Sequence, residues 1–270
     1  MLLQCVRRPQ AAAAAAALVF LFLGASMRTI PAAAAAPAPA VSRVSVETRD
    51  GWKISGLYHP PRRRLPVAIL IHGAESGKGE WEGFSPMLWE RGFGTLAIDL
   101  RGHGESKAGP RGREDFQSAL NARRAWPSAE EDLRAAVREI RRVAPASPVG
   151  MIGASIGANL ASVVFQEDRR IAWLVLLSPG IEYRDVRLAL PPRGPVAVAA
   201  SPADAYAFAS ARALAAQSPN VKFFKGSTGH GVQMFADARF ASRILAWIER
   251  ASKSPKSGRA PVLSTATTRR

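Results

Sequence analysis

The stretch VGMIGASIGANLA, residues 149–161, contains the feature that decides the fold. An apolar run meets a helical pattern at Ser155, and this serine stands between Gly153 and Gly157. The arrangement indicates a nucleophile on a sharp turn from a strand into a helix, and the alternative is an ordinary glycine-rich connection. With 22 glycines and 22 serines in 270 residues, a G-x-S-x-G match arises by chance in roughly one such sequence in seven. The surrounding pattern therefore has to decide between the two.

Apolar runs alternate with helical patterns along the chain. The runs lie at residues 66–73, 93–104, 148–155, 171–180, 195–201 and 221–227. The helical patterns lie at residues 128–143, 156–167, 205–217 and 233–250. Ser128 and Glu131 predict a capping box at the first helix, and Asp50-Gly51 predicts a hairpin between two extended stretches. Together these signals predict an α/β fold with a mostly parallel sheet and helices on both faces.

The formal net charge of +16 is unevenly distributed. Eight basic and no acidic residues lie in 1–40 and 251–270, so the middle keeps 29 basic and 21 acidic residues, or +8. No basic stripe with interleaved aromatic residues is present, and we expect no nucleic-acid partner. Cys5 is the single cysteine of the sequence, which excludes an intramolecular disulfide and a multi-thiolate metal site.

The first 40 residues are typical of an export signal followed by an Ala/Pro-rich segment. Arg7 and Arg8 precede the apolar stretch 11–25, and cleavage is expected after Ala35 or Ala40. We therefore expect an exported protein, periplasmic or secreted; the alternative is a membrane anchor formed by an uncleaved segment. Residues 41–251 would form the folded domain, and residues 252–270 a basic disordered tail.

At this point the chain resembles the α/β-hydrolase superfamily over about residues 45–250. The resemblance rests on LIHGAE (70–75), DLRGHGES (99–106), GASIG (153–157) and GHG (229–231), which occur in the expected order. It is nearest in motif to the serine aminopeptidase and monoacylglycerol lipase branch. This resemblance implies the α/β-hydrolase fold and makes Ser155 the candidate nucleophile.

The resemblance also implies the other site residues. Among the four histidines, it places the catalytic one at His230. The acid should lie between Ser155 and His230 in this fold, where Asp204 is preferred and Glu182 and Asp185 stay open. The backbone N–H groups of Ile156 and Ala74 would form the oxyanion hole. Glu75 lies near that hole, and we expect a solvated loop residue or a group that tunes the charge of the substrate. In the motif DLRGHGES (99–106), we expect Asp99, Arg101, His103 and Ser106 to be scaffold residues of the loop.

These expectations describe an exported serine hydrolase that cleaves a small-molecule carboxylic ester, with an amide as the second option, through an acyl-enzyme. No cofactor and no metal are expected, because no metal-ligand cluster, P-loop or dinucleotide fingerprint is present. Residues 181–194 are too short for a helical lid domain, and 107–127 are the other possible cover, so we expect an open site. The alternatives are a non-catalytic binding protein on the same fold and a cell-envelope structural protein that binds anionic polymers through its tail.

Overall fold

The computed structural model describes residues 40–189 and 194–253. The expected signal segment lies outside these residues except for Ala40, and the expected tail except for Ser252 and Lys253. Both of these last residues belong to the final helix, so the helix extends two residues past the boundary expected from the sequence.

Ten strands form the main sheet, in the order β12-β11-β8-β7-β3-β4-β2-β5-β6, with β1 paired to β2. Six of them run parallel: β3 (Val67–Ile71), β4 (Gly94–Ile98), β7 (Val149–Ala154), β8 (Ile171–Leu177), β11 (Val196–Ala200) and β12 (Val221–Lys225). The antiparallel strands are β1 (Ser42–Glu47), β2 (Lys53–His59), β5 (Ala108–Gly109) and β6 (Gly112–Arg113). All six predicted apolar runs contain one of the parallel strands, and the hairpin at Asp50-Gly51 joins β1 to β2.

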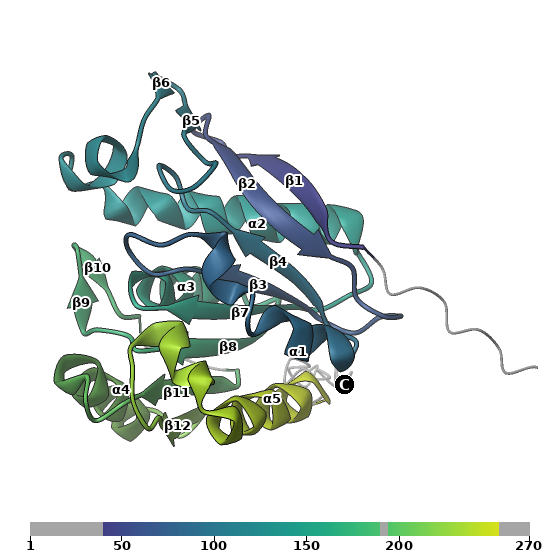
Figure 1. Ribbon diagram of the computed structural model, residues 1–270, viewed down its shortest axis with the longest axis vertical. Helices are drawn as coiled ribbons and strands as arrows, with labels where there is room; N and C mark the ends of the chain where they lie inside the picture. Colours follow the sequence, from purple (N-terminus) through teal and green to yellow (C-terminus); the bar gives the residue numbers. More distant parts are fainter. Residues whose placement is uncertain (1–39, 190–193, 254–270) are drawn as a thin grey trace, which may run out of the picture. The chain divides into compact units, whose positions relative to one another are not determined.

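Helices cover both faces of this sheet (Figure 1). One face carries α2 (Glu130–Val143), α3 (Ile156–Glu167) and α4 (Ala205–Gln217); the other carries α1 (Ser85–Glu90) and α5 (Ala238–Lys253). Alternate residues of β3 point to opposite faces of the sheet. Ile69 therefore packs in the core beneath α2, α3 and α4, and Leu70 packs in the core beneath α1 and α5. The α/β-hydrolase fold predicted from the sequence is confirmed.

Short elements connect the main ones. They are the 3-10 helices Lys78–Trp81, Trp126–Ala129 and Gly231–Ala236, the π-helical turn Gln117–Asn121, and the two-stranded hairpin of β9 (Glu182–Tyr183) and β10 (Val186–Arg187). No helix in the described parts of segment 181–194 forms a lid.

The start of α2 differs from the sequence-based prediction. Residues 126–129 form a 3-10 turn and α2 begins at Glu130, with no side-chain cap from Ala129. The hydroxyl of Ser128 donates to the carbonyl of Ala125 at 2.7 Å and accepts from Arg101 Nη1 at 3.1 Å. The predicted capping box is therefore wrong, because the Ser128 hydroxyl is already engaged elsewhere. Helix α1, only six residues long, was not predicted at all.

Candidate active site

Ser155 occupies the turn between β7 and α3. Its φ of 55° and ψ of −124° lie in a region that non-glycine residues rarely adopt. Such a conformation costs of the order of 1–3 kcal/mol and persists only where the surroundings enforce it. One constraint is the hydrogen bond from Ser155 N to the carbonyl of Leu177 in β8, at 2.8 Å.

The two glycines around the serine are required by close packing. A Cβ on Gly153 would lie 2.4 Å from the carbonyl oxygen of Gly157, and a Cβ on Gly157 would lie 2.4 Å from the carbonyl oxygen of His72. Both oxygens are main-chain atoms that cannot swing aside. Glycine at both positions therefore lets the strand and the helix approach each other around Ser155.

His230 and Asp204 are brought together from two loops that follow neighbouring parallel strands. His230 comes after β12 and Asp204 after β11, and His230 Nδ1 lies 2.6 Å from Asp204 Oδ2. Asp204 is also the N-cap of α4, where Oδ1 accepts from Ala207 N at 3.4 Å. The helix cap and the imidazole thus use different oxygens of one carboxylate, which holds that carboxylate in a defined orientation.

The loop that carries His230 packs beside the serine. A Cβ on Gly231 would lie 3.2 Å from the Cβ of Ala154, and Gly231 N donates to Ser178 Oγ at 2.9 Å. Gly231 has a φ of 59°. The neighbours of Ser155 and His230 in the sequence are therefore in contact with each other at the carboxyl ends of the strands.

The other two candidate acids have different partners. Asp185 accepts from Arg124 Nη2 at 2.7 Å and from Nε at 3.1 Å, and this guanidinium lowers the pKa of Asp185. Glu182 lies 3.4 Å from Arg187 Nε. Within residues 40–189 and 194–253, the carboxylate that contacts the imidazole of His230 is that of Asp204.

The loop after β3 carries Ala74 and approaches the serine from the other side. A Cβ on Gly73 would lie 3.3 Å from Ser155 Cβ. The buried His72 orients this loop: Nε2 accepts from Leu100 N at 2.9 Å, so Nδ1 carries the proton and donates to Gly73 O at 2.6 Å. In a trans peptide the carbonyl and the following N–H point in opposite directions. The Ala74 N–H therefore points away from His72.

Neither proposed oxyanion donor is engaged in a protein hydrogen bond in the described part of the chain. Ala74 N and Ile156 N have no acceptor there, whereas Ser155 N and Ala158 N do. Ile156 is the first residue of α3, and a helix N-terminus carries a partial positive charge of about half a unit. Two unengaged N–H groups beside a serine can stabilise an oxygen that becomes negative.

Glu80 is a residue of this region that the sequence did not suggest. Its Oε1 accepts from Gly73 N at 3.2 Å, and burial raises its pKa. It lies on the 3-10 helix Lys78–Trp81, where a single turn offers no periodicity to detect. Glu75, the residue that the sequence did indicate, is exposed and faces Arg184 Nη2 at 3.6 Å.

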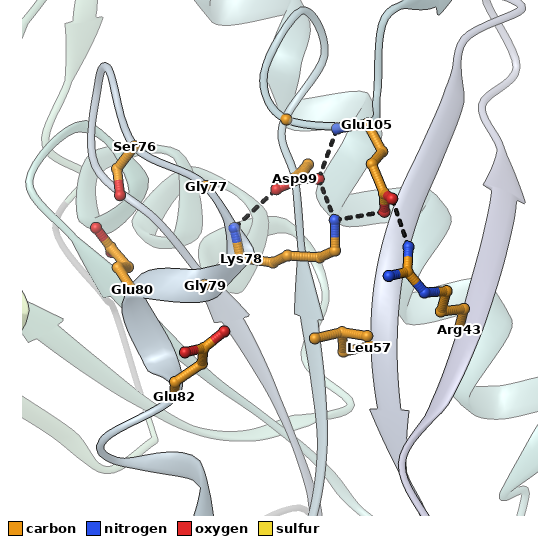
Figure 2. Close-up of a pocket in the computed structure, with 11 residues that line it drawn as sticks. Arg43, Leu57, Ser76, Gly77, Lys78, Gly79, Glu80, Glu82, Asp99 and Glu105 are labelled. Carbon is orange, nitrogen blue, oxygen red and sulfur yellow. Dashed lines mark hydrogen bonds and ion pairs between the residues drawn. The ribbon is translucent and has the colours of Figure 1, made fainter.

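The residues of the loop motif after β4 form two polar networks that connect this loop to neighbouring segments. Asp99 accepts hydrogen bonds from Lys78 N at 2.7 Å and from Glu105 N at 2.9 Å. The Lys78 ammonium lies between the carboxylates of Asp99 and Glu105 (Figure 2). The residues of this network line a cavity of about 470 Å³, and Arg43 lines it as well. Asp99 thereby fastens the loop after β3, which contains Ala74, to the loop after β4.

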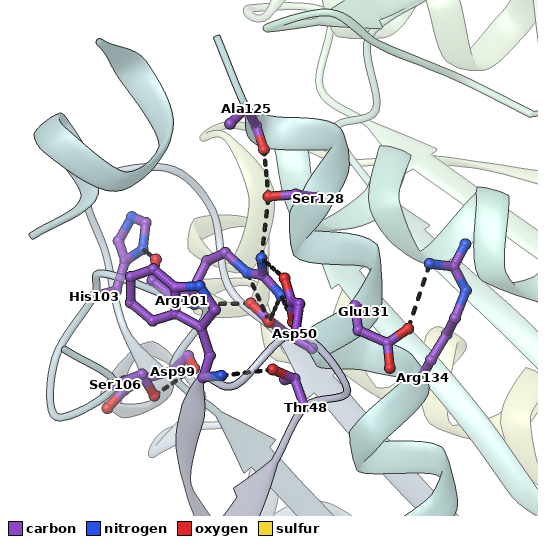
Figure 3. A network of polar contacts seen from close by, with 12 residues as sticks. Thr48, Asp50, Asp99, Arg101, His103, Ser106, Ala125, Ser128, Glu131 and Arg134 are labelled. Atoms are coloured by element: carbon purple, nitrogen blue, oxygen red, sulfur yellow. Dashed lines mark hydrogen bonds and ion pairs between the residues drawn. The ribbon is translucent and has the colours of Figure 1, made fainter. Parts of the chain in front are cut away.

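The second network surrounds Arg101 (Figure 3). Its guanidinium binds the fully buried Asp132 through Nε at 2.9 Å and Nη2 at 2.7 Å, and it binds Asp50 through Nη1 at 2.6 Å. Ser106 Oγ donates to Asp99 O at 2.8 Å, and His103 stacks on Phe116 with ring centroids 4.6 Å apart. All four motif residues contact structural partners, as expected for a scaffold.

No group of three or more His, Cys, Asp or Glu side chains in the described residues could hold a metal ion. Among the same residues, no helix is both long and apolar enough to cross a membrane.

Comparison with known proteins agrees with this architecture. The family model described as serine aminopeptidase, S33, matches residues 63–263. No curated protein matches the sequence significantly. An esterase from Pyrococcus furiosus is similar in structure, with a TM-score of 0.62 and 18% identity over 79% of this chain and 91% of that one.

Two further solved structures show the same fold. Dienelactone hydrolase from Anabaena variabilis has a TM-score of 0.62 and 17% identity over 80% of this chain and 96% of its own. An α/β serine hydrolase homologue from Coxiella burnetii has a TM-score of 0.59 and 18% identity over 77% of this chain and 96% of its own. At these identities the likeness establishes the fold alone.

Proposed function

The chain belongs to the serine aminopeptidase (S33) family of α/β-hydrolases, and from this premise we propose that it is an exported serine hydrolase that cleaves carboxylic esters with Ser155, His230 and Asp204. The observation that carries the proposal is the 2.6 Å contact between His230 Nδ1 and Asp204 Oδ2, beside the strained turn of Ser155. A serine hydroxyl is a weak nucleophile at neutral pH and needs such an oriented base.

The proposed reaction has two steps. In the first, Ser155 Oγ attacks the ester carbonyl carbon while His230 Nε2 takes the hydroxyl proton and then delivers it to the leaving alcohol. This produces the free alcohol and an acyl-serine. In the second, His230 takes a proton from water, the resulting hydroxide attacks the acyl carbon, and the proton returns to Ser155. The carboxylic acid leaves and the enzyme is restored.

Asp204 and the two backbone donors support these steps. Asp204 would keep the Nδ1 proton of His230 in place and stabilise the imidazolium. Ile156 N and Ala74 N would bind the oxyanion, and each such donor is worth about 3–4 kcal/mol in the transition state. Because both donors are main-chain groups, the side chains at these two positions are free to vary.

Labelling with a fluorophosphonate tests the nucleophile. We expect one label per chain at Ser155 and none in the Ser155→Ala variant. A folded protein that resists the reagent would support the alternative, a binding protein that only shares the fold. Parallel assays on p-nitrophenyl esters of graded chain length and on aminoacyl anilides would then decide between ester and amide substrates.

Export is tested separately. We expect the mature chain to begin near Ala36 or Val41, as read by N-terminal sequencing of protein from the cell envelope or the medium. A start at Met1 would favour the membrane anchor.

A further inference from the structure

The hairpin of β9 and β10 is a fixed wall of the proposed site. Asn159, fully buried in α3, donates through Nδ2 to the carbonyls of Gly180 and Val186, both at 2.9 Å, and accepts from Gly180 N at 3.2 Å. Since Asn159 lies one helical turn after Ser155, these bonds fix the base of the hairpin relative to the serine.

The hairpin also borders the proposed acid. The ring of Tyr183 packs edge-on against that of Tyr206, with centroids 5.5 Å apart. Burial together with the charge of Asp204 raises the pKa of Tyr183 to about 12. The tip of the hairpin, Arg184 and Asp185, has positive φ values of 50° and 67°. Its side chains are therefore presented by a tight turn whose base is held beside the serine.

Arg184 holds its guanidinium at this tip with one edge that makes no hydrogen bond and pairs only with the exposed Glu75. Nη1 donates to Asn121 Oδ1 at 2.9 Å, and the group lies over the ring of Trp126 at 5.4 Å. Within the described residues, Nε and Nη2 make no hydrogen bond; Nη2 forms an ion pair with Glu75 Oε1, whose distance of 3.6 Å is too long for a hydrogen bond. That side-on edge has the geometry that binds a carboxylate through two parallel hydrogen bonds.

The neighbouring Arg124 provides the contrast. Its Nε and Nη2 both bind Asp185, so the same edge of that guanidinium is occupied. Arg124 is 79% exposed, whereas Arg184 is 40% exposed and held against an aromatic ring. Of Arg124 and Arg184, Arg184 is the one whose Nε–Nη2 edge makes no hydrogen bond and can therefore receive a carboxylate from a ligand.

This edge of Arg184 faces the side chain of the residue that follows a proposed oxyanion donor. Glu75, which faces it, directly follows Ala74, and consecutive Cα atoms are about 3.8 Å apart. Glu75 is 64% exposed, and exposed ion pairs of this kind contribute little to stability. An incoming carboxylate could therefore replace the Glu75 carboxylate at little cost, at a position that the side chain of Glu75 joins to the backbone beside Ala74.

Topology indicates which part of the substrate would reach Arg184. The leaving alcohol must lie toward His230, which follows β12 at one end of the sheet. Asn121 and Trp126, the partners of Arg184, follow β4 on the other side of β7. Arg184 itself follows β8, but its guanidinium contacts Asn121, Trp126 and Glu75, which follow β4 and β3 on the other side of β7 from β12. An acyl chain directed away from His230 would run toward these contacts.

We propose that Arg184 is a specificity-determining residue that binds a carboxylate at the end of the acyl chain, so that the substrates are half esters of short dicarboxylic acids. This proposal rests on the proposed esterase function. Hydrolysis would release the alcohol and a dicarboxylate.

The test compares monoethyl glutarate with ethyl pentanoate, its neutral counterpart of equal chain length, by measuring ethanol release. We expect kcat/KM of the unmodified protein to be about tenfold higher for the half ester, mainly through KM. Arg184→Met should abolish this preference, and Arg184→Lys should restore part of it, since a lysine keeps the charge but not the fork. Arg124→Met is the matched control and should keep the preference.

A direct binding measurement keeps the proposal independent of turnover. Titration calorimetry with glutarate should show binding to the unmodified protein and to Arg124→Met, and binding at least tenfold weaker to Arg184→Met. Hydrolysis of both esters without preference overturns the role of Arg184 alone, as does an equal loss on both esters in Arg184→Met. Arg184-dependent glutarate binding without hydrolysis of any ester overturns the esterase proposal alone, and absence of both overturns the two together.

Discussion

His230 Nδ1 lies 2.6 Å from Asp204 Oδ2, although the two residues are 26 positions apart and follow different strands. The contact arises because β11 and β12 are parallel neighbours in register, with Ala200 opposite Lys225. The loops that follow them therefore start at the same level of the sheet edge.

This contact predicts the effect of removing the acid. Asp204→Asn should lower kcat by about 10⁴ with little change in KM, because an amide N–H facing Nδ1 favours the wrong imidazole tautomer. The Asn oxygen can still cap α4 at Ala207 N, so the fold should survive, as checked by circular dichroism. Asp185→Asn, which removes only an exposed ion pair with Arg124, is the control and should keep its turnover. A variant Asp204→Asn that retains more than about a tenth of kcat would mean that another group orients the histidine.

A second prediction concerns the packing of the serine turn. Gly157→Ala places a Cβ 2.4 Å from the carbonyl oxygen of His72, and the resulting overpacking should destabilise the protein by about 1–3 kcal/mol or more. Gly83→Ala is the matched control, since nothing lies within 4 Å of its added Cβ. Urea unfolding of both variants measures the difference. Equal stabilities would show that the turn is more open than described.

A third prediction concerns acid stability. Burial, reinforced by the nearby His103, lowers the pKa of His72 to about 3, against about 6.5 in an unfolded chain. Between these values the unfolded state binds the proton and the folded state does not. This contribution to stability is therefore complete above pH 6.5 and is lost by about 1.4 kcal/mol per unit as pH falls toward 3.

A comparison with the variant His72→Gln separates the titration of His72 from that of other groups. The charges of Asp99 and Lys78 also act on the pKa of His72. The free energy of unfolding from urea titrations at pH 4, 5, 6 and 7 should fall more steeply with acid for the unmodified protein than for the variant. Parallel profiles would show that His72 titrates normally in the folded state.

A fourth prediction concerns access to the site. The described parts of segment 181–194 form only the short β9–β10 hairpin, and Asn159 fixes its base. We therefore expect hydrolysis of soluble short-chain esters without interfacial activation. Rates measured across the critical micelle concentration of a p-nitrophenyl ester should change smoothly, and a sharp rise above that concentration would indicate a cover that opens.

The sequence was sufficient for the fold and for the position of Ser155. Parallel strands are buried on both faces, so each appears as a continuous apolar run that needs no knowledge of its neighbours. The signal from Gly153 and Gly157 is equally local, since both glycines allow the same strand-to-helix turn to close. Where local rules misled, at Ser128, the hydroxyl was taken by Arg101 from another loop.

Only the tertiary structure decided which acidic side chain meets His230 and which groups surround the site. Asp204, Asp185 and Glu182 all stand in the right interval of the sequence, and the order of strands brings Asp204 to the imidazole. Glu80 and Arg184 carry no local signature either, because their partners Gly73, Asn121 and Glu75 lie in other segments or turns. Hydrogen bonds and ion pairs act over a few ångströms of space. Separation along the sequence does not tell which side chains come that close, because the assembled sheet decides which loops are neighbours.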